Sequence, residues 1–128
     1  MAFPPRKVLL AAREEHLAPR LFSSASSLAK RMSAGLEILM QADRESPPEI
    51  DAGQARHLQE EGIAYRLTCR AALSAQDVVR YANTHECVVC VVIDAPENWG
   101  GASAVWEKLA CPLVVTAQNP SAPIAGNG

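Results

Sequence analysis

The sequence lacks the features that mark several large classes of protein. It has no apolar run long enough to span a bilayer, and its first residues contain no apolar segment of the kind found in secretory signals. Twelve lysines and arginines stand against fourteen aspartates and glutamates, and the basic residues are scattered, so no stretch is marked for a nucleic-acid backbone. We therefore expect a cytoplasmic protein that neither inserts into a membrane nor binds nucleic acid.

The length and composition indicate one ordinary domain. The chain has 128 residues, of which 48% are apolar and 20% charged. A chain of this size buries roughly 68% of the surface that its unfolded form exposes, so it needs no disulfide or metal to fold. We expect the domain to occupy residues 1–117, followed by a flexible tail over 118–128, because that tail is polar and interrupted by Pro and Gly.

The four cysteines do not form a metal or disulfide pattern. Only Cys87 and Cys90 are close in sequence, and no histidine lies at ligand spacing from them. A redox pair of this spacing usually opens a helix, whereas these two lie in the apolar segment 86–94, which is typical of a buried strand. We predict four reduced thiols that pack as small apolar side chains, with a redox pair as the alternative.

Two hydrophobic periodicities alternate along the chain. Continuous or alternating apolar runs indicate strands, and apolar residues three and four positions apart indicate helices. Pro48 suits a first helical turn, Gly35 and Gly62 are expected to end helices, and Ser74 with Asp77 forms a capping box. We predict strands over 7–12, 36–41, 63–69, 87–93 and 111–116, helices over 17–32, 49–61 and 75–84, and a last helix that carries Val105, Trp106 and Leu109.

Strict alternation of strands and helices predicts a three-layer α/β/α fold. Right-handed crossovers between successive strands give a parallel sheet with helices on both faces. The segment 63–69 alternates more openly between apolar and polar residues than the other strands, and it carries Arg66. Such a strand suits the edge of the sheet, because a charged side chain there discourages pairing with other chains.

The chain resembles the universal stress protein family over about residues 6–117. The resemblance is carried mainly by the segment 101–115, where Gly101, a short helix and Cys111-Pro112 precede a Val-rich strand. The helix opened by Ser74 and the apolar first strand support it. The resemblance implies a five-stranded parallel sheet of order 3-2-1-4-5, of the adenine nucleotide alpha hydrolase-like type. It also implies an adenine-nucleotide site at the carboxyl ends of strands one and four, and a homodimer that pairs through the last strand, Pro112–Thr116.

The sequence departs from this family where nucleotide would bind. Nucleotide-binding members carry an Asp after strand one, and here Arg13 stands near that place. They also carry a loop of the form Gly-x2-Gly-x9-Gly-(Ser/Thr), whereas strand four is followed only by the short segment 94–101. Glycines let backbone N–H groups approach a phosphate, so a shorter loop loses most of these donors. Asp94 and Glu97 would also repel a triphosphate.

What remains of the site suggests at most one small anion. Gly100 and Gly101 followed by a Ser cap can hold an anionic group at a helix start, and a plain loop with a helix cap is the alternative. Arg13 can pair with the anion, or it can simply be solvated where it leaves the strand. The end of strand two contributes to the base pocket in the family. The predicted ligand-binding residues are Ala12, Arg13, Gln41, Gly100, Gly101 and Ser103.

Three functions remain open at this stage. The leading one is a regulatory or stress-response domain, not an enzyme, with a degenerate nucleotide site and no cofactor beyond a weakly bound adenine nucleotide. It would act through a small anionic ligand or a protein partner such as a transporter or sensor kinase. The second is an ATP- or AMP-binding stress protein with slow or no hydrolysis. The third, an enzyme of the wider hydrolase-like group, lacks the expected phosphate motif after strand one.

Other side chains give no catalytic pattern. The histidines His16, His57 and His85 stand at predicted helix edges without a nucleophile or carboxylate at triad spacing, so we interpret them as surface residues. Trp106 is expected to anchor the last helix on the sheet. Trp99 can cover the shortened pocket or contact a partner.

Overall fold

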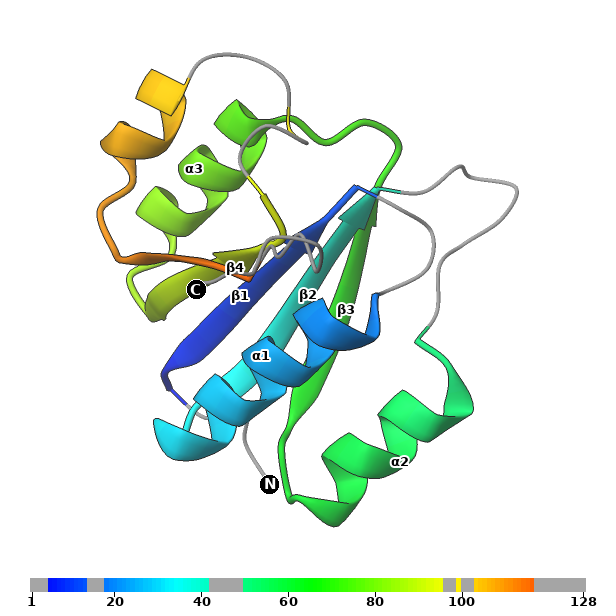
Figure 1. Ribbon diagram of the computed structural model, residues 1–128. Coiled ribbons are helices and arrows are strands. Elements are labelled where there is room, and N and C mark those ends of the chain that lie inside the picture. The colour runs from blue at the N-terminus through cyan, green and yellow to red at the C-terminus, as the bar shows by residue number, and fades with distance from the viewer. Residues whose placement is uncertain (1–4, 14–17, 42–49, 96–98, 100–102, 117–128) are drawn as a thin grey trace, which may run out of the picture.

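A computed structural model describes residues 5–13, 18–41, 50–95, 99 and 103–116, and it contains a parallel sheet between two layers of helices (Figure 1). The elements in chain order are β1 (Lys7–Ala12), α1 (Pro19–Arg31), β2 (Gly35–Gln41), α2 (Ala52–Glu60), β3 (Tyr65–Arg70), α3 (Ala75–Thr84), β4 (Val88–Ile93), the 3-10 helix η2 (Ser103–Lys108) and β5 (Leu113–Val115). No helix within these residues is long and apolar enough to cross a bilayer.

The sheet has five parallel strands in the order β3-β2-β1-β4-β5, which confirms the predicted fold and topology. All six residues of the central strand β1 are buried, as a strand covered on both faces requires. Most residues of β3 are exposed or half-buried, which confirms that this strand forms one edge. The short strand β5 forms the other edge.

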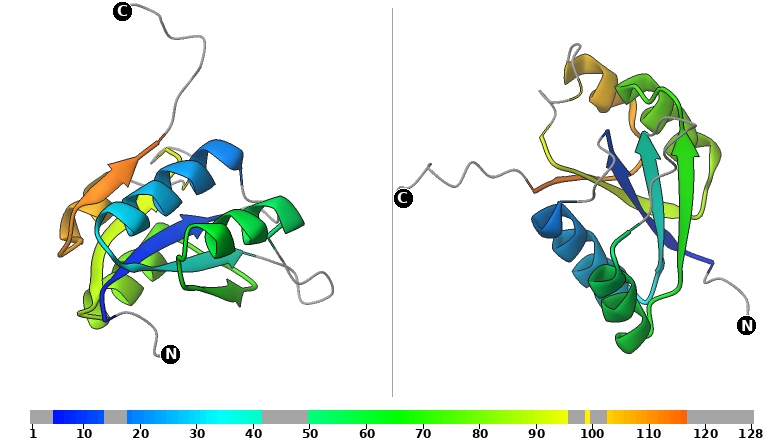
Figure 2. Two further views of the ribbon diagram at one scale, coloured as in Figure 1. Left: turned by 90° about the horizontal axis from the view of Figure 1, so that it is seen from below. Right: turned by 90° about the vertical axis from the view of Figure 1, so that its right-hand side faces the viewer.

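Two hydrophobic cores lie on opposite faces of the sheet, and Figure 2 shows the helix layers that cover them. Because successive strand residues point to opposite faces, Val8 and Leu10 of β1 face α1 and α2, while Leu9 and Ala11 face α3 and η2. β4 contributes one more residue than β1 to their pairing, since Lys7 lies opposite Val88 and Val8 lies opposite Cys90. This places a β-bulge at Val89.

Helix α1 forms where the apolar stripe predicted it, but its end differs from the prediction. Leu21, Phe22 and Ala25 are buried against the sheet. The predicted stop at Gly35 is wrong, because Gly35 is already the first residue of β2. The left-handed residue after the helix is Ser33, with φ of 53°. Two backbone hydrogen bonds close this turn, from the Ser33 N–H to the Lys30 carbonyl and from the Ala34 N–H to the Ala29 carbonyl, so the helix ends two residues earlier than expected.

Helix α2 begins later than predicted, at Ala52 rather than Glu49. Asp51 is its N-cap, and the Asp51 carboxylate accepts a hydrogen bond from the Gln54 backbone N–H at 2.7 Å while the Gln54 side chain accepts from the Asp51 N–H. The prediction that Pro48 begins the helix is therefore wrong. The helix ends at Gly62 as predicted, because Gly62 has φ of 72°, a conformation that suits a residue without Cβ.

The last predicted helix is a 3-10 helix of six residues, η2. It still places Trp106 against the sheet, where this side chain is buried as predicted. Helix α3 has the predicted bounds, and its capping box between Ser74 and Asp77 is present. The predicted tail over 118–128 lies outside the described residues.

The cysteines are free, but they are not all packed as predicted. Cys90 is buried in the core beneath α1, and burial raises its pKa to about 11. Cys87 and Cys111 are half-buried. Cys69 is exposed, so its interpretation as a core residue is wrong; it lies on β3, an edge strand of the sheet formed by the described residues. The described residues contain no group of three potential metal ligands.

Candidate functional site

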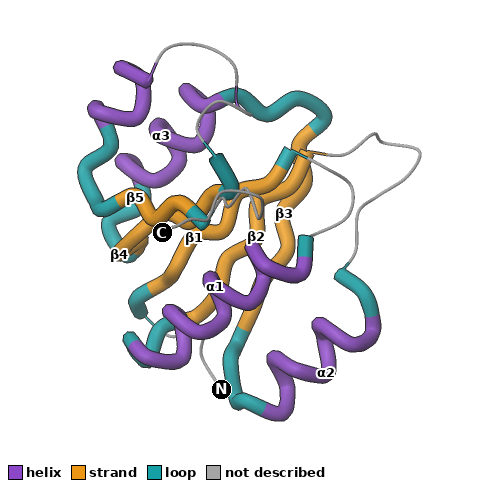
Figure 3. The backbone as a smooth tube through the Cα atoms, in the orientation of Figure 1, coloured by secondary structure: helices purple, strands orange, loops and turns teal. Residues whose placement is uncertain are grey.

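A crevice is expected at the carboxyl ends of β1 and β4. The helix after β1, α1, lies on one face of the sheet, whereas the chain after β4 continues to η2 on the other face (Figure 3). Ligands of open parallel sheets bind where two such crossovers diverge. Arg13 leaves β1 at this point, and Asp94 leaves β4. The structure therefore places these two predicted site segments at the same edge of the sheet.

Trp99 is the central side chain of this edge. It is only 4% exposed, and its ring packs edge-on against Trp106 with centroids 5.8 Å apart. Its indole N–H donates a hydrogen bond to the Asp94 carboxylate at 3.3 Å. The Arg13 guanidinium lies over the Trp99 ring at 5.7 Å from the ring centroid. Trp99 thus joins the end of β1, the end of β4 and η2 within this chain.

Two other predicted ligand-binding residues, Ala12 and Gln41, make contacts within the chain. Ala12 is buried in the core beneath α1. The Gln41 side-chain carbonyl accepts a hydrogen bond from the Leu73 backbone N–H at 2.8 Å, which ties the connection before α3 to the end of β2. No comparison or contact tests whether either residue binds a ligand, so both roles remain predictions.

The predicted anion site at the start of the last helix loses part of its physical basis. Ser103 is the first residue of η2. A 3-10 helix of six residues aligns few peptide dipoles, so it offers an anion little of the field that a full α-helix provides. Gly100 and Gly101 lie outside the described residues.

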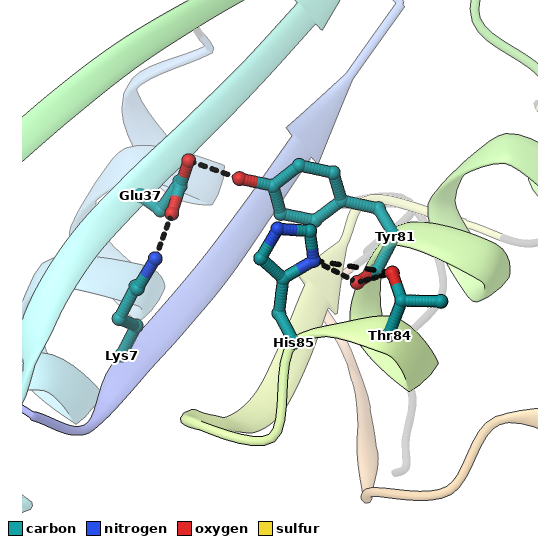
Figure 4. Close-up of polar contacts among 5 residues, drawn as sticks. All are labelled: Lys7, Glu37, Tyr81, Thr84 and His85. Atoms are coloured by element: carbon teal, nitrogen blue, oxygen red, sulfur yellow. Dashed lines mark hydrogen bonds and ion pairs between the residues drawn. The ribbon is translucent and has the colours of Figure 1, made fainter.

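A buried ionic network at the opposite end of the sheet was missed by the sequence analysis (Figure 4). The Lys7 ammonium contacts one carboxylate oxygen of Glu37 at 2.8 Å, and the Tyr81 hydroxyl donates to the other oxygen. Glu37 is 1% exposed. His85 stacks on the Tyr81 ring with centroids 4.0 Å apart, and its Nδ1 lies 2.6 Å from the Tyr81 carbonyl oxygen. His85 is therefore half-buried, and its interpretation as a surface residue is wrong.

The network favours an ionised Glu37. Burial alone would raise the pKa of Glu37, but the hydrogen bonds from Lys7 and Tyr81 and the charge of Lys7 outweigh it, so the pKa lies below its ordinary value. Burial and the neighbouring Glu37 carboxylate raise the pKa of Tyr81. Lys7 is the first residue of β1, so this network lies at the amino edge, away from the crevice. The sequence held a signal for this network, because each of two apolar strands contains one charged residue, Lys7 and Glu37. Buried charges of this kind require partners.

The sheet order and the helices on both faces define a three-layer α/β fold. Within that class, the chain has the fold of universal stress proteins. The universal stress protein from Archaeoglobus fulgidus matches with a TM-score of 0.57 and 14% identity, over 84% of this chain and 92% of that one. A universal stress protein from Archaeoglobus fulgidus in complex with dAMP matches with a TM-score of 0.52 and 14% identity, over 85% of this chain and 96% of that one.

A third structure, of a universal stress protein family member from Burkholderia pseudomallei, matches with a TM-score of 0.52 and 17% identity, over 89% of this chain and 98% of that one. No model of a protein family matches the sequence, and no curated protein matches it. At such low identity the likeness establishes the fold, and the residues of the site must carry any statement about function.

Proposed function

We propose that this chain is a divergent universal stress protein, a regulatory domain that binds adenine nucleotides weakly or not at all. It acts through protein contacts or a small anionic ligand, not as an enzyme. The fold, the topology and the stress proteins that share them support the family assignment. The buried Trp99 side chain at the carboxyl ends of β1 and β4 supports weak or absent nucleotide binding.

The observation that carries the proposal is the buried position of Trp99. The Trp99 ring packs against Trp106, and Arg13 lies over it. The end of β1 and the connection after β4 are therefore engaged in contacts within the chain. A nucleotide at this edge would have to displace the Trp99 side chain, which is 4% exposed. Removing a buried Trp side chain costs on the order of 3 to 5 kcal/mol. This cost opposes binding.

The charges and the chain length at the edge also oppose a triphosphate. The Asp94 carboxylate holds the Trp99 indole N–H, so a negative charge lies beside the ring. Only residues 94–102 connect β4 to η2, which leaves little backbone to surround phosphates. The residues present therefore do not fit a phosphate-binding loop of the kind that the resemblance implies.

Calorimetric titration with ATP and AMP tests the proposal. We expect no saturable heat at micromolar nucleotide, and no change in the fluorescence of the two tryptophans, of which Trp99 lies at the crevice. Micromolar ATP binding that is abolished by Gly101→Asp would overturn the proposal. Because the buried Trp99 side chain opposes binding, Trp99→Ala, which removes this side chain, should bind AMP more tightly than the wild type.

An adenine mononucleotide is the second candidate. One of the structures that share the fold is described as a complex with dAMP, and in this chain the Arg13 guanidinium lies at the carboxyl end of β1, where the family resemblance implies a nucleotide. In this alternative Arg13 would leave the Trp99 ring and pair with a single phosphate. AMP binding that is lost in Arg13→Gln but kept in Arg20→Gln, an exposed residue of α1, would favour it.

We propose further that two copies pair through β5. This strand is at the edge of the sheet, its outer side has no neighbouring strand among the described residues, and Val115 is 46% exposed. The Pro112 carbonyl accepts a hydrogen bond from β4, and the Thr116 N–H donates one to β4. Because successive residues of a strand alternate in direction, the backbone groups of Leu113 and Val115 point to the open side. An uncovered apolar edge strand favours association with another copy.

A further inference from the structure

We propose that the outer surface between α3 and η2 is a second binding site, for a small organic anion with an apolar body. The site is a hollow of about 300 Å³. It is lined by Gln76, Val79, Arg80, Asn83, Val105 and Lys108. Figure 1 shows α3 and η2 side by side, on the face opposite α1 and α2. Neither Trp99 nor Arg13 lines the hollow, so it is distinct from the candidate site at the carboxyl ends of β1 and β4.

Two cations and no carboxylate line the hollow. The Arg80 and Lys108 side chains come from different elements, α3 and η2, and neither forms an ion pair with a described residue. The acidic residue of α3, Asp77, is the cap partner of Ser74 and does not line the hollow, although the charge of Arg80 helps to lower the pKa of Asp77. Glu107 precedes Lys108 on η2 but does not line the hollow. The charge presented to a ligand here is therefore positive.

The walls combine this charge with an apolar surface and a rigid support. Val79 and Val105 give the hollow an apolar floor. The Asn83 side-chain N–H donates to the Lys108 carbonyl at 2.9 Å, and its carbonyl accepts from the Ala110 N–H at 2.8 Å. Asn83 therefore joins the backbone at the end of η2 to α3, so the two walls of the hollow are held together before any ligand arrives. A site arranged in advance loses less conformational entropy on binding.

These features select the class of ligand. The volume is at the lower end of the range for small-molecule sites, which suits a ring or short chain rather than a nucleotide. Arginine and lysine together recognise a phosphate or carboxylate, and the Gln76 amide can donate a further hydrogen bond. We assign the site to a small phosphate monoester or carboxylate whose apolar part lies on Val79 and Val105.

Titration with phenyl phosphate, followed by NMR of the backbone amides, tests this assignment. We expect saturable shifts confined to residues 76–83 and 105–110. Inorganic phosphate and phenol, the two halves of the probe, should each bind more weakly, because one lacks the apolar body and the other lacks the charge. The double variant Arg80→Gln with Lys108→Gln should weaken phenyl phosphate binding about tenfold, since each removes a charge-assisted contact.

A matched double variant on the other face controls for net charge. Arg31→Gln with Arg56→Gln removes two exposed cations from α1 and α2, and it should leave the affinity unchanged. Equal weakening in both double variants would mean attraction by net charge alone and would overturn the proposal. Absence of saturable shifts, or shifts centred on Trp99, would also overturn it. Binding of ATP at the crevice is measured separately, so the failure of the proposed function leaves this result interpretable.

Discussion

At the scale of single residues, charge inside the sheet is the most informative feature. Glu37 is almost fully buried, and a carboxylate in that position is stable only because Lys7 and Tyr81 both bond to it. Arg66 of β3 lies opposite Glu37 in the sheet and adds a further positive charge. This cluster connects β1, β2 and α3 through one side chain.

Replacing Glu37 by Gln should destabilise the protein by about 3 kcal/mol, because it leaves the buried Lys7 charge without its partner. Denaturant unfolding measures the change. The triple variant Lys7→Met, Glu37→Leu and Tyr81→Phe removes every polar member together and should lie within about 1 kcal/mol of the wild type. If the single substitution costs no more than the triple one, the network is not an ionic one.

The same carboxylate predicts a dependence of stability on pH. The folded-state pKa of Glu37 lies below its ordinary value of 4.5, so the folded state favours the ionised form. This contribution is complete above about pH 5.5 and is lost as the pH falls through the folded-state pKa. The stability difference between the wild type and Glu37→Gln should therefore shrink in acid. Other carboxylates with lowered pKa values, such as Asp77, remain in both proteins and cancel in the difference.

At the scale of elements, the helix starts depend on side-chain caps. Asp51 and Ser74 each form a capping box, but only the second was recognised in the sequence. Three residues separate the Ser74 box from the preceding strand, and a clear apolar stripe follows it. Asp51 follows Ser46-Pro47-Pro48, and a proline is itself a signal for a first helical turn, which drew the predicted start toward residue 49.

Asp51→Ala should lower the free energy of unfolding by about 1 kcal/mol, because the Gln54 backbone N–H loses its acceptor. Thermal or denaturant unfolding provides the measurement. Glu60→Ala is the control. Glu60 is an exposed residue at the other end of the same helix, so this substitution should change stability by less than about 0.5 kcal/mol. Equal effects of the two substitutions would contradict a role for the cap.

At the scale of the whole molecule, the two edges of the sheet differ in what they expose. The edge strand β3 carries Arg66 and Arg70, whereas β5 is apolar. Charge on an edge discourages pairing, and its absence permits pairing. The proposed dimer therefore uses β5 and not β3.

Val115→Lys should convert the proposed dimer into a monomer, because it places a charge on the apolar edge without entering either core. Light scattering at fixed concentration gives the molar mass. Tyr65→Lys is the matched control, since Tyr65 is 41% exposed on the opposite edge, and it should remain dimeric. A monomeric wild type, or dissociation by Tyr65→Lys as well, would rule out pairing through β5.

The candidate site was only partly accessible from the sequence. The positions of Arg13 and Asp94 at the ends of β1 and β4 followed from the alternation of elements, because parallel strands bring their carboxyl ends to one edge. The packing of Trp99 between Arg13 and Trp106 did not follow, since it depends on contacts among segments far apart in the chain. The hollow between α3 and η2 is likewise a product of how two elements pack.

The sequence by itself determined the elements and their order, because hydrophobic periodicity and turn residues act over a few neighbouring positions. It also indicated the parallel sheet, since successive strands joined by helices have few ways to pair. Tertiary structure alone decided which charged and aromatic side chains meet. The Lys7 and Glu37 charges became partners only when β1 and β2 lay side by side, and the Val89 bulge arose only from the pairing of β1 with β4.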